Sequence, residues 1–466
     1  MGQRAARLAR TATCVVALWA VAAGSARELR QTTAFAGQPF ITVWNAPTHD
    51  CDRYSVPLDL SLFDMVASPN EGFYDQQLTI FYKDRLGRYP HYADGGPVHG
   101  GVPQNASLRL HLAQLERDVQ RYMRSRERAG LAVIDWEEWR PLWIRNWQGK
   151  QVYRDRSLAL VQEHHSDWDA AQRARQAQFE FEQAARKFMI STLQRARNTR
   201  PRSLWGFYLF PDCYNHGYAG GAGNYTGHCP DVEVSRNDLL AWLWAGSTAL
   251  YPSIYLARSL RGTPAARSFV RSRLREALRV AREHGREGAL PVFVYSRPSY
   301  SYTTELLTQQ DLVTTVGETA ALGAAGIIFW GDTDYSNSAE RCRMMSDYLS
   351  GDLGRYLLNV TSATRQCSRF LCAGNGRCER RNSEADTYLH LSSYSFRIEA
   401  APGPGGGLRV TGVLSQSDKA ALQLDFQCRC FHGWRGQRCD VGTSGGSLIL
   451  PSALAPIIAL LLSLAM

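Results

Sequence analysis

The chain lacks the short motifs by which many enzyme classes are recognised. No glycine-rich phosphate loop follows the first expected strand, which disfavours a nucleotide-binding sheet. The expected strands offer no serine or cysteine in a nucleophile elbow, no His-Glu-x-x-His motif and no conspicuous metal cluster. We therefore expect neither a cofactor nor a metal ion in this protein.

The composition argues against several further classes. Hydrophobic residues make up 44% of the 466 positions and charged residues 21%, with 12 Trp, 21 Tyr and 17 Phe. Disordered chains, collagen, coiled coils and multi-span membrane proteins have different compositions, so we expect two or three globular domains, or one large barrel with an appendage. The net charge of +10 suits an acidic polysaccharide or a membrane surface as well as nucleic acid, and does not choose among them.

The N-terminus has the pattern of a secretory signal. Arg4, Arg7 and Arg10 precede an apolar stretch over residues 12–23, which small residues follow. We expect residues 1–26 to be a signal peptide, because the apolar run is short and its flank basic, which disfavours a buried first helix.

The C-terminus is apolar from Leu448 to Met466, and no basic residue follows it. A spanning helix usually has such residues on its cytoplasmic side, so we expect residues 441–466 to be a removable GPI-attachment signal and not a transmembrane anchor. The mature protein would then lie on the extracellular face of the plasma membrane, with an endosomal or lysosomal pool as an alternative.

The cysteine count agrees with an oxidising compartment. Of eleven cysteines, Cys14 lies in the expected signal, and the remaining ten predict five disulfides. Sequons at Asn105, Asn224 and Asn359 are expected glycosylation sites.

From residue 27 to about residue 360, strand-like and helix-like segments alternate. The strand candidates are residues 40–44, 78–82, 131–135, 204–209, 253–256, 291–295 and 327–330, and the helical stretches are residues 108–128, 170–197, 265–284 and 311–324. Such alternation implies a parallel sheet, and at this length an α/β fold of the distorted TIM-barrel type is favoured over an open sheet.

The composition changes beyond this region. Six cysteines between residues 361 and 440 have the spacing C-x4-C-x5-C-x49-C-x-C-x8-C, which is similar to an EGF-like module with a long insertion. A zinc site is the alternative, but the compartment is oxidising and no His/Cys ligand pairing recurs.

The segment 131–139 carries the clearest chemistry, because a buried-strand pattern ends abruptly in acidic residues. Residues i and i+2 of a strand point to the same side, so we expect Asp135 and Glu137 to share one face and Glu138 to point elsewhere. Charge repulsion and aromatic cover would keep one carboxyl protonated as a general acid, as in glycosidases. A solvated loop is the alternative for an isolated Asp-x-Glu.

Polar and aromatic residues also follow the other strands, and in a barrel these strand ends meet at one mouth. These residues are Tyr82, Tyr208, Asp212, Tyr251, Arg297, Trp330 and Asp332. A retaining glycosidase needs a carboxylate nucleophile beside its acid, and here only Asp135 is available. The exception is substrate assistance, in which a 2-acetamido group attacks the anomeric carbon.

Four segments resemble the animal hyaluronidases, and their membrane-anchored members most. They are Ser68-Pro69-Asn70-Glu71-Gly72-Phe73, Val133-Ile134-Asp135-Trp136-Glu137, the run from Trp205 through Tyr208 and Asp212 to Asn215, and Leu250-Tyr251-Pro252-Ser253-Ile254-Tyr255. The resemblance covers residues 38–440 and implies endo-hydrolysis of hyaluronan at the β-1,4 bond after N-acetylglucosamine, at the cell surface, with no nucleic-acid partner.

The resemblance also implies roles for single residues. Glu137 matches the proton donor, Asp135 the carboxylate that holds the acetamido group, and Tyr208 and Tyr251 the tyrosines that position it. Trp330 and Tyr82 would line the cleft. Arg297 follows a strand near the expected mouth, and this place makes it a candidate for meeting glucuronate carboxylates. Each tyrosine could instead be a packing residue, and Trp330 could simply cap the core.

By the same resemblance, the disulfides would join Cys51 with Cys342, Cys213 with Cys229, Cys367 with Cys378, Cys372 with Cys428, and Cys430 with Cys439. A hyaluronan-binding protein or receptor with little turnover is the rival function. The intact Asp-x-Glu and the two tyrosines favour the enzyme.

Overall fold

The computed structural model describes residue 35 and residues 37–67, 74–220, 225–285, 289–401 and 407–443. The expected signal peptide, the motif at residues 68–73, Asn224 and residues 444–466 of the expected GPI signal lie outside these ranges. In the described part of the chain, no helix has both the length and the apolar composition needed to cross a bilayer.

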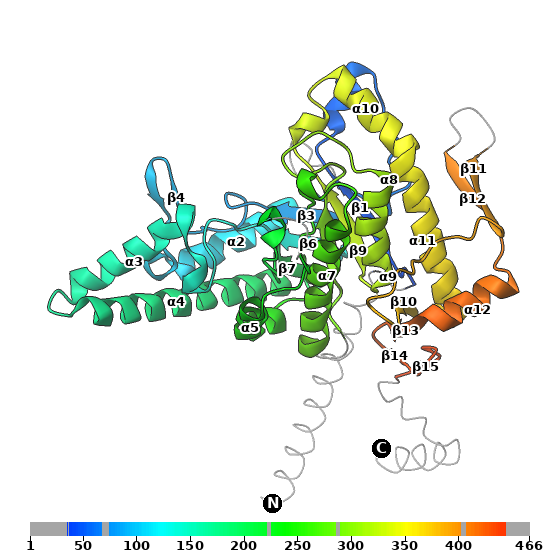
Figure 1. Cartoon of the computed structure of the whole chain (residues 1–466). Coiled ribbons are helices and arrows are strands. Elements are labelled where there is room, and N and C mark those ends of the chain that lie inside the picture. The colour runs from blue at the N-terminus through cyan, green and yellow to red at the C-terminus, as the bar shows by residue number, and fades with distance from the viewer. Residues whose placement is uncertain are drawn as a thin grey trace, which may run out of the picture.

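The centre of the molecule is a run of parallel strands (Figure 1). The strands are β1 (Ile41–Asn45), β2 (Met65–Val66), β3 (Leu78–Phe81), β6 (Gly130–Ile134), β7 (Ser203–Phe207), β8 (Phe293–Ser296) and β9 (Gly326–Trp330). They form two sheets with the orders β2-β1-β9-β8 and β3-β6-β7. Across the described residues no ladder joins β2 to β3, so the closed barrel stays a prediction.

The two sheets are connected through the segment between β7 and β8, where the sequence predicts a strand over residues 253–256. That strand is absent, and Leu250, Tyr251 and Ser253 make isolated parallel bridges to Val292, Tyr208 and Tyr295 instead. Pro252 has no backbone N–H to give to a ladder, which explains why the pairing is interrupted here.

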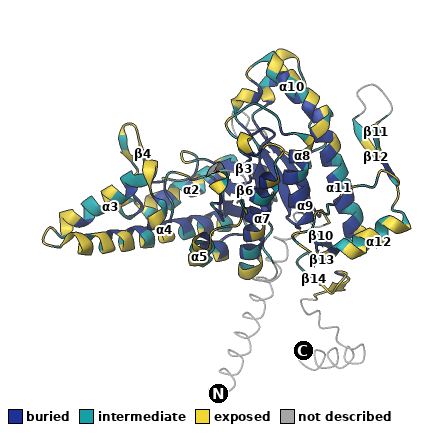
Figure 2. Ribbon diagram, in the orientation of Figure 1, coloured by how far each residue is buried: buried dark blue, intermediate teal, exposed yellow. Residues whose placement is uncertain are grey.

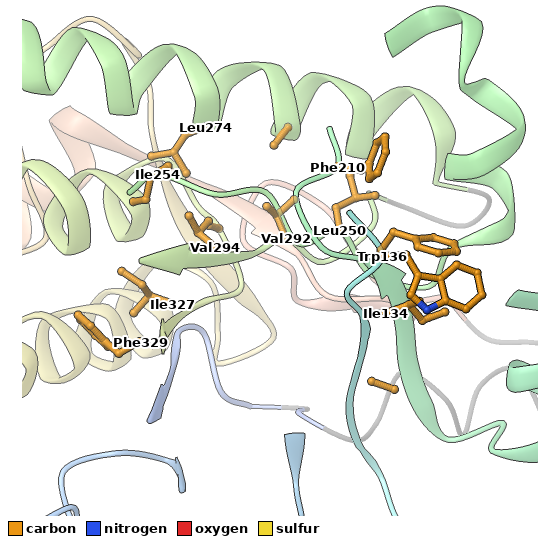
Figure 3. Packing of buried hydrophobic residues seen from close by; sticks show 14 of the residues in the cluster. Ile134, Trp136, Phe210, Leu250, Ile254, Leu274, Val292, Val294, Ile327 and Phe329 are labelled. Carbon is orange, nitrogen blue, oxygen red and sulfur yellow. The ribbon is translucent and has the colours of Figure 1, made fainter. Parts of the chain in front are cut away.

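The strands separate two apolar clusters. On one face, side chains from all seven strands form one cluster, with Ile41, Val43, Leu131, Val133 and Ile328 among them. The alternate residues point outward to the helices, as Figure 3 shows for Ile134, Val294, Ile327 and Phe329. Because both faces are covered, the strands are almost continuously apolar in sequence.

Helices follow most of the strands. They are α2 (Leu108–Tyr122), α3 (Gln151–His164), α4 (Ala170–Thr199), α5 (Asp231–Leu239), α6 (Ala241–Gly246), α7 (Pro264–His284), α8 (Gln309–Leu312), α9 (Glu318–Ala321), α10 (Ala339–Ser350) and α11 (Asp352–Leu371). A π-helical turn, Val313–Gly317, joins α8 to α9 within the predicted helix 311–324. The predicted helix 108–128 ends at Tyr122, and the buried Arg200 guanidinium binds the carbonyls of Met123 and Arg124 that follow it.

Two long helices extend away from the strands. α3 and α4 lie side by side, with the small hairpin of β4 (His91–Ala93) and β5 (Gly96–Val98) beside them (Figure 1). Figure 2 shows that the far end of this helical pair is exposed, whereas the strands are buried. Helix α3 was not predicted from the sequence.

The C-terminal part packs against this body as a small disulfide-rich unit. β10 (Gly376–Arg380) pairs with β13 (Phe426–Cys430), and β14 (Trp434–Arg435) with β15 (Val441–Gly442). The long insertion between β10 and β13 forms β11 (Phe396–Ala400), β12 (Leu408–Gly412) and α12 (Gln416–Asp425). The expected domain boundary at residues 360 and 361 falls inside α11.

A buried ion cluster ties this unit to the body. Glu318, at the start of α9, is fully buried and accepts hydrogen bonds from Arg271 of α7 and Arg380 of β10. Arg271 also reaches Asp386 and the carbonyl of Glu384.

All five expected disulfides are confirmed. They are Cys51–Cys342, Cys213–Cys229, Cys367–Cys378, Cys372–Cys428 and Cys430–Cys439. The first joins residues 291 positions apart and links the start of the strand region to α10.

Candidate active site

A cleft of about 1170 Å³ lies where the parallel strands end. Seven of the nine residues expected at the strand ends line it: Asp135, Glu137, Tyr208, Asp212, Arg297, Trp330 and Asp332. The loops after β6 and β7 and the segment after Tyr251 supply most of its walls, because parallel strands deliver their C-terminal loops to one edge of the sheet.

Asp135 follows β6 directly and is the more buried of the two central carboxylates. Its backbone N–H donates to the carbonyl of Phe81 at 2.9 Å, and its Oδ1 atom is buried without a hydrogen-bond partner in the structure. Burial raises the pKa of Asp135 to about 8, and the charges of Glu137 and Glu138 act in the same direction. Asp135 is therefore the carboxyl that holds a proton at neutral pH.

Glu137 projects into the open part of the cleft, where half of its side chain is exposed. Its Oε2 atom lies 3.3 Å from a guanidinium nitrogen of Arg140, and its backbone carbonyl accepts from Arg140 at 2.9 Å and from Lys150. The expectation that Glu138 points elsewhere is wrong, because Glu138 also lines the cleft and pairs with Lys83 at 3.0 Å. β6 ends at Ile134, so strand alternation no longer applies at this position.

Tyr208 stands on the floor of the cleft within a group of hydroxyls. It shares hydrogen bonds with Tyr255 and Ser253, and its ring meets that of Tyr295 edge-on at 5.0 Å. Burial raises the pKa of Tyr208 well above its usual value, so the phenol remains neutral and can donate a hydrogen bond. Tyr255 also lines the cleft, although it was not among the predicted site residues.

Tyr251 does not reach the cleft. It is fully buried, and its hydroxyl donates at 2.7 Å to the carbonyl of Leu204, near the start of β7. Its ring occupies the space beside Gly206, where a Cβ atom would meet the ring at 3.0 Å. The ring thus points back along the sheet, and the packing alternative applies to this tyrosine.

Trp330 and Tyr82 belong to one aromatic wall. The indole N–H of Trp330 donates to the Tyr82 hydroxyl at 3.1 Å, and the Trp330 ring stacks on Tyr255 with centroids 6.2 Å apart. Burial raises the pKa of Tyr82 to about 12, against the opposing effect of this hydrogen bond. Arg297 lies over Trp330 at 5.2 Å and is paired with Asp332 at 2.6 Å. The charge of Arg297 is therefore already compensated.

A second charged group lies further along the cleft around Asp212. Burial alone would raise the pKa of Asp212, but Arg273 at 3.2 Å and the backbone N–H of Tyr214 bring it below its usual value. Asp212 thus remains ionised and holds Arg273 in place. Two carboxylates in different environments beneath aromatic walls are typical of a glycoside hydrolase.

The model of the hyaluronidase family matches residues 29–443, so the chain belongs to this family of glycoside hydrolases. It is 54% identical to Hyaluronidase-2 of Homo sapiens over 420 residues, which cover 89% of each protein. It is 47% identical to Hyaluronidase-1 of Bitis arietans over 409 residues, covering 87% of this chain and 91% of the relative.

Two solved structures are similar. Bee venom hyaluronidase superposes with a TM-score of 0.60 at 29% identity, covering 68% of this chain and 99% of the bee protein. The bee enzyme in complex with a hyaluronic acid tetramer superposes with a TM-score of 0.61, also at 29% identity. This chain is therefore an enzyme of the hyaluronidase family.

Proposed function

We propose that the protein hydrolyses internal β-1,4 bonds between N-acetylglucosamine and glucuronate in hyaluronan. The observation that carries this proposal is the pair formed by a half-buried Asp135, whose pKa is raised to about 8, and an exposed Glu137 at the edge of an aromatic cleft. The hyaluronic acid tetramer in the bee enzyme supports hyaluronan as the substrate.

In the proposed mechanism the substrate supplies the nucleophile. The acetamido oxygen attacks the anomeric carbon while Glu137 gives a proton to the departing glycosidic oxygen. The proton of the carboxylate pair rests on Asp135 and passes to Glu137 when the polymer covers the site. Asp135 is then a carboxylate, which accepts the acetamido N–H and stabilises the positive charge that develops on this group. Glu137 next activates a water molecule, whose attack restores the proton to the pair.

Tyr255, and not Tyr251, takes the second tyrosine role in this proposal. Only Tyr255 lines the cleft and is hydrogen-bonded to Tyr208. Tyr208 lies within the field of both carboxylates and is a neutral donor that can hold the acetamido group against Asp135, and Tyr255 donates to Tyr208 and fixes its hydroxyl.

The remaining expectations complete the proposal. The strands close into a distorted barrel, the C-terminal unit is an EGF-like module with an insertion, and Asn105, Asn224 and Asn359 carry glycans.

A GPI anchor holds the protein at the cell surface. A phosphatidylinositol-specific phospholipase should then release it from intact cells. Retention on the cells, with Met466 detected by mass spectrometry, would contradict the anchor.

The test of the activity is to incubate the purified protein with hyaluronan over a range of pH and to size the products. We expect fragmentation by the wild type and at least a roughly 100-fold slower rate for Glu137→Gln, with hyaluronan binding retained. The reducing end formed first should be the β-anomer, because two successive inversions give net retention. An α-anomer would indicate direct attack by water. Binding without fragmentation would favour the rival function of a hyaluronan receptor.

A further inference from the structure

The positive charges of the cleft differ in how they are compensated. Six cationic side chains line it: Arg140, Arg145, Lys150, Arg236, Arg273 and Arg297. Each of the five arginines lies within 4 Å of a carboxylate, but the five share only four: Glu137 pairs with Arg140, Glu233 with both Arg145 and Arg236, Asp212 with Arg273, and Asp332 with Arg297. Among the residues that the structure describes, no carboxylate oxygen lies within 4 Å of the Lys150 ammonium group.

This difference matters for an anionic polymer. A carboxylate that approaches Arg273 or Arg297 also meets the negative charge of Asp212 or Asp332, so the two effects largely cancel. The ammonium group of Lys150 has no carboxylate partner within 4 Å, so an incoming anion can pair with it directly. Burial and the charge of Arg140 lower the pKa of Lys150, whereas the charges of Glu137 and Glu138 act in the opposite direction, and neither of these carboxylates forms an ion pair with it.

Lys150 is also held next to the reacting groups. It ends the 3-10 helix Gln148–Lys150 and precedes α3, and its side chain is half-buried. One of its three N–H donors binds the backbone carbonyl of Glu137, which leaves two for a ligand. The charge is therefore fixed beside the backbone of the residue that gives the proton.

The chemistry of the polymer then selects one sugar ring. The glycosidic oxygen that receives the proton from Glu137 is attached to C4 of glucuronate, and the carboxylate of that ring is carried by the neighbouring carbon, C5. Of all carboxylates along hyaluronan, this one comes nearest to the proton donor.

We propose that Lys150 binds the carboxylate of the glucuronate ring on the leaving-group side of the cleaved bond, and so selects uronate polymers. This inference rests on the proposed function. A charge-assisted hydrogen bond from an ammonium group that is already in place strengthens the binding of this ring and aligns its C4 oxygen with Glu137.

The test compares two polymers, hyaluronan and carboxyl-reduced hyaluronan, in which glucose replaces glucuronate. Lys150→Met should lower kcat/KM for hyaluronan by roughly 10- to 100-fold, the range for losing a hydrogen bond to a charged group. On the reduced polymer the variant and the wild type should agree within about twofold, because the anion that Lys150 binds is missing. Lys150→Arg should keep part of the preference for the anionic polymer. Lys187→Met is the matched control, since Lys187 lies exposed on α4, away from the cleft, and should behave as wild type.

Binding provides an arm that does not depend on turnover. In the Glu137→Gln background, Lys150→Met should weaken the binding of a hyaluronan oligosaccharide and leave that of its carboxyl-reduced form unchanged. Equal losses on both polymers would overturn the proposal, because Lys150 would then only hold the Glu137 backbone. Unchanged activity and binding on hyaluronan would overturn it as well. If the wild type fragmented no hyaluronan, the proposed function would fail, and the binding arm would still decide the role of Lys150.

Discussion

The carboxyl group of Asp135 occupies a position that lowers the stability of the folded protein at neutral pH. Its folded pKa of about 8 lies far above the ordinary value of 3.8. The folded form therefore binds more protons than the unfolded form between about pH 4 and pH 8, and the free energy of unfolding falls as the pH rises through this interval.

Removing this charge should stabilise the protein. We expect Asp135→Asn to raise the free energy of unfolding by on the order of 2–5 kcal/mol at pH 8, and this gain should shrink toward pH 4. The variant should no longer hydrolyse hyaluronan. Urea titrations at the two pH values measure this. Asp167→Asn, at an exposed position, is the control and should change little. A gain that did not depend on pH would contradict the raised pKa.

The same protonation sets an upper pH limit for activity. The carboxylate pair keeps its proton only below about pH 8, so kcat/KM should fall as the pH rises through that value. A pH–rate profile on hyaluronan checks this, and activity that persisted undiminished to pH 10 would contradict the assignment.

Tyr251 and Tyr255 separate a packing role from a role in the cleft. Tyr255→Phe removes a hydroxyl bonded to Tyr208, and we expect kcat/KM to fall about 10- to 100-fold with little change in stability. Tyr251→Phe removes the hydroxyl that donates to the carbonyl of Leu204, which should cost about 0.5–1.5 kcal/mol of stability with kcat retained. The test is to measure kcat/KM and the free energy of unfolding for both variants. The reverse pattern would indicate that Tyr251, and not Tyr255, acts in the cleft.

At the scale of single residues, the sequence predicted the acidic pair and the aromatic cleft but not the choice between these tyrosines. Both tyrosines lie in one apolar motif. Only the packing of the Tyr251 ring beside Gly206 shows that Tyr251 is the one buried in the core. The compensation of Arg297 by Asp332 was equally invisible, because ion pairing depends on which loops the fold brings together.

At the scale of elements, the parallel strands were predictable because burial on both faces leaves continuous apolar runs. α3 escaped prediction because its buried stripe consists of Tyr153, Ser157 and Val161, and the serine interrupts the apolar period. Ser157 is satisfied by the carbonyl of Tyr153 and by Gln104, so a polar residue is tolerated in that place.

The contact between α9 and β10 depends on Glu318. Glu318→Gln removes the charge that compensates Arg271 and Arg380, and we expect a loss of about 3–5 kcal/mol in the free energy of unfolding. Glu384→Gln is the control, because that side chain is more than half exposed and its pairs should contribute less than about 1 kcal/mol. Denaturant titration of both variants provides the comparison, and equal losses would contradict the importance of burial.

At the scale of the whole molecule, the sequence predicted the β/α order and all five disulfides, the latter through resemblance. It did not predict that α11 would run through the expected domain boundary or that an ion cluster would join the two parts. Both depend on tertiary packing, which leaves no periodic signal along the chain.

The Cys51–Cys342 bond should contribute more stability than a bond closing a short loop. The entropy of loop closure grows with loop length, so replacing both cysteines by serine should lower stability by on the order of 5 kcal/mol, against about 3 kcal/mol for the Cys430–Cys439 pair. Thermal unfolding of the two double variants checks the order, and a larger loss for the short loop would contradict it.

The same bond gives the chain the topology of a covalent ring with two tails. A protease that cuts any single peptide bond between residues 51 and 342 opens the ring but releases no fragment, because the two pieces stay joined through Cys51–Cys342. Such a nicked molecule would run as one band in denaturing electrophoresis without reductant and as two bands with it. Two cuts within the ring are needed before any piece of the chain between Cys51 and Cys342 can leave.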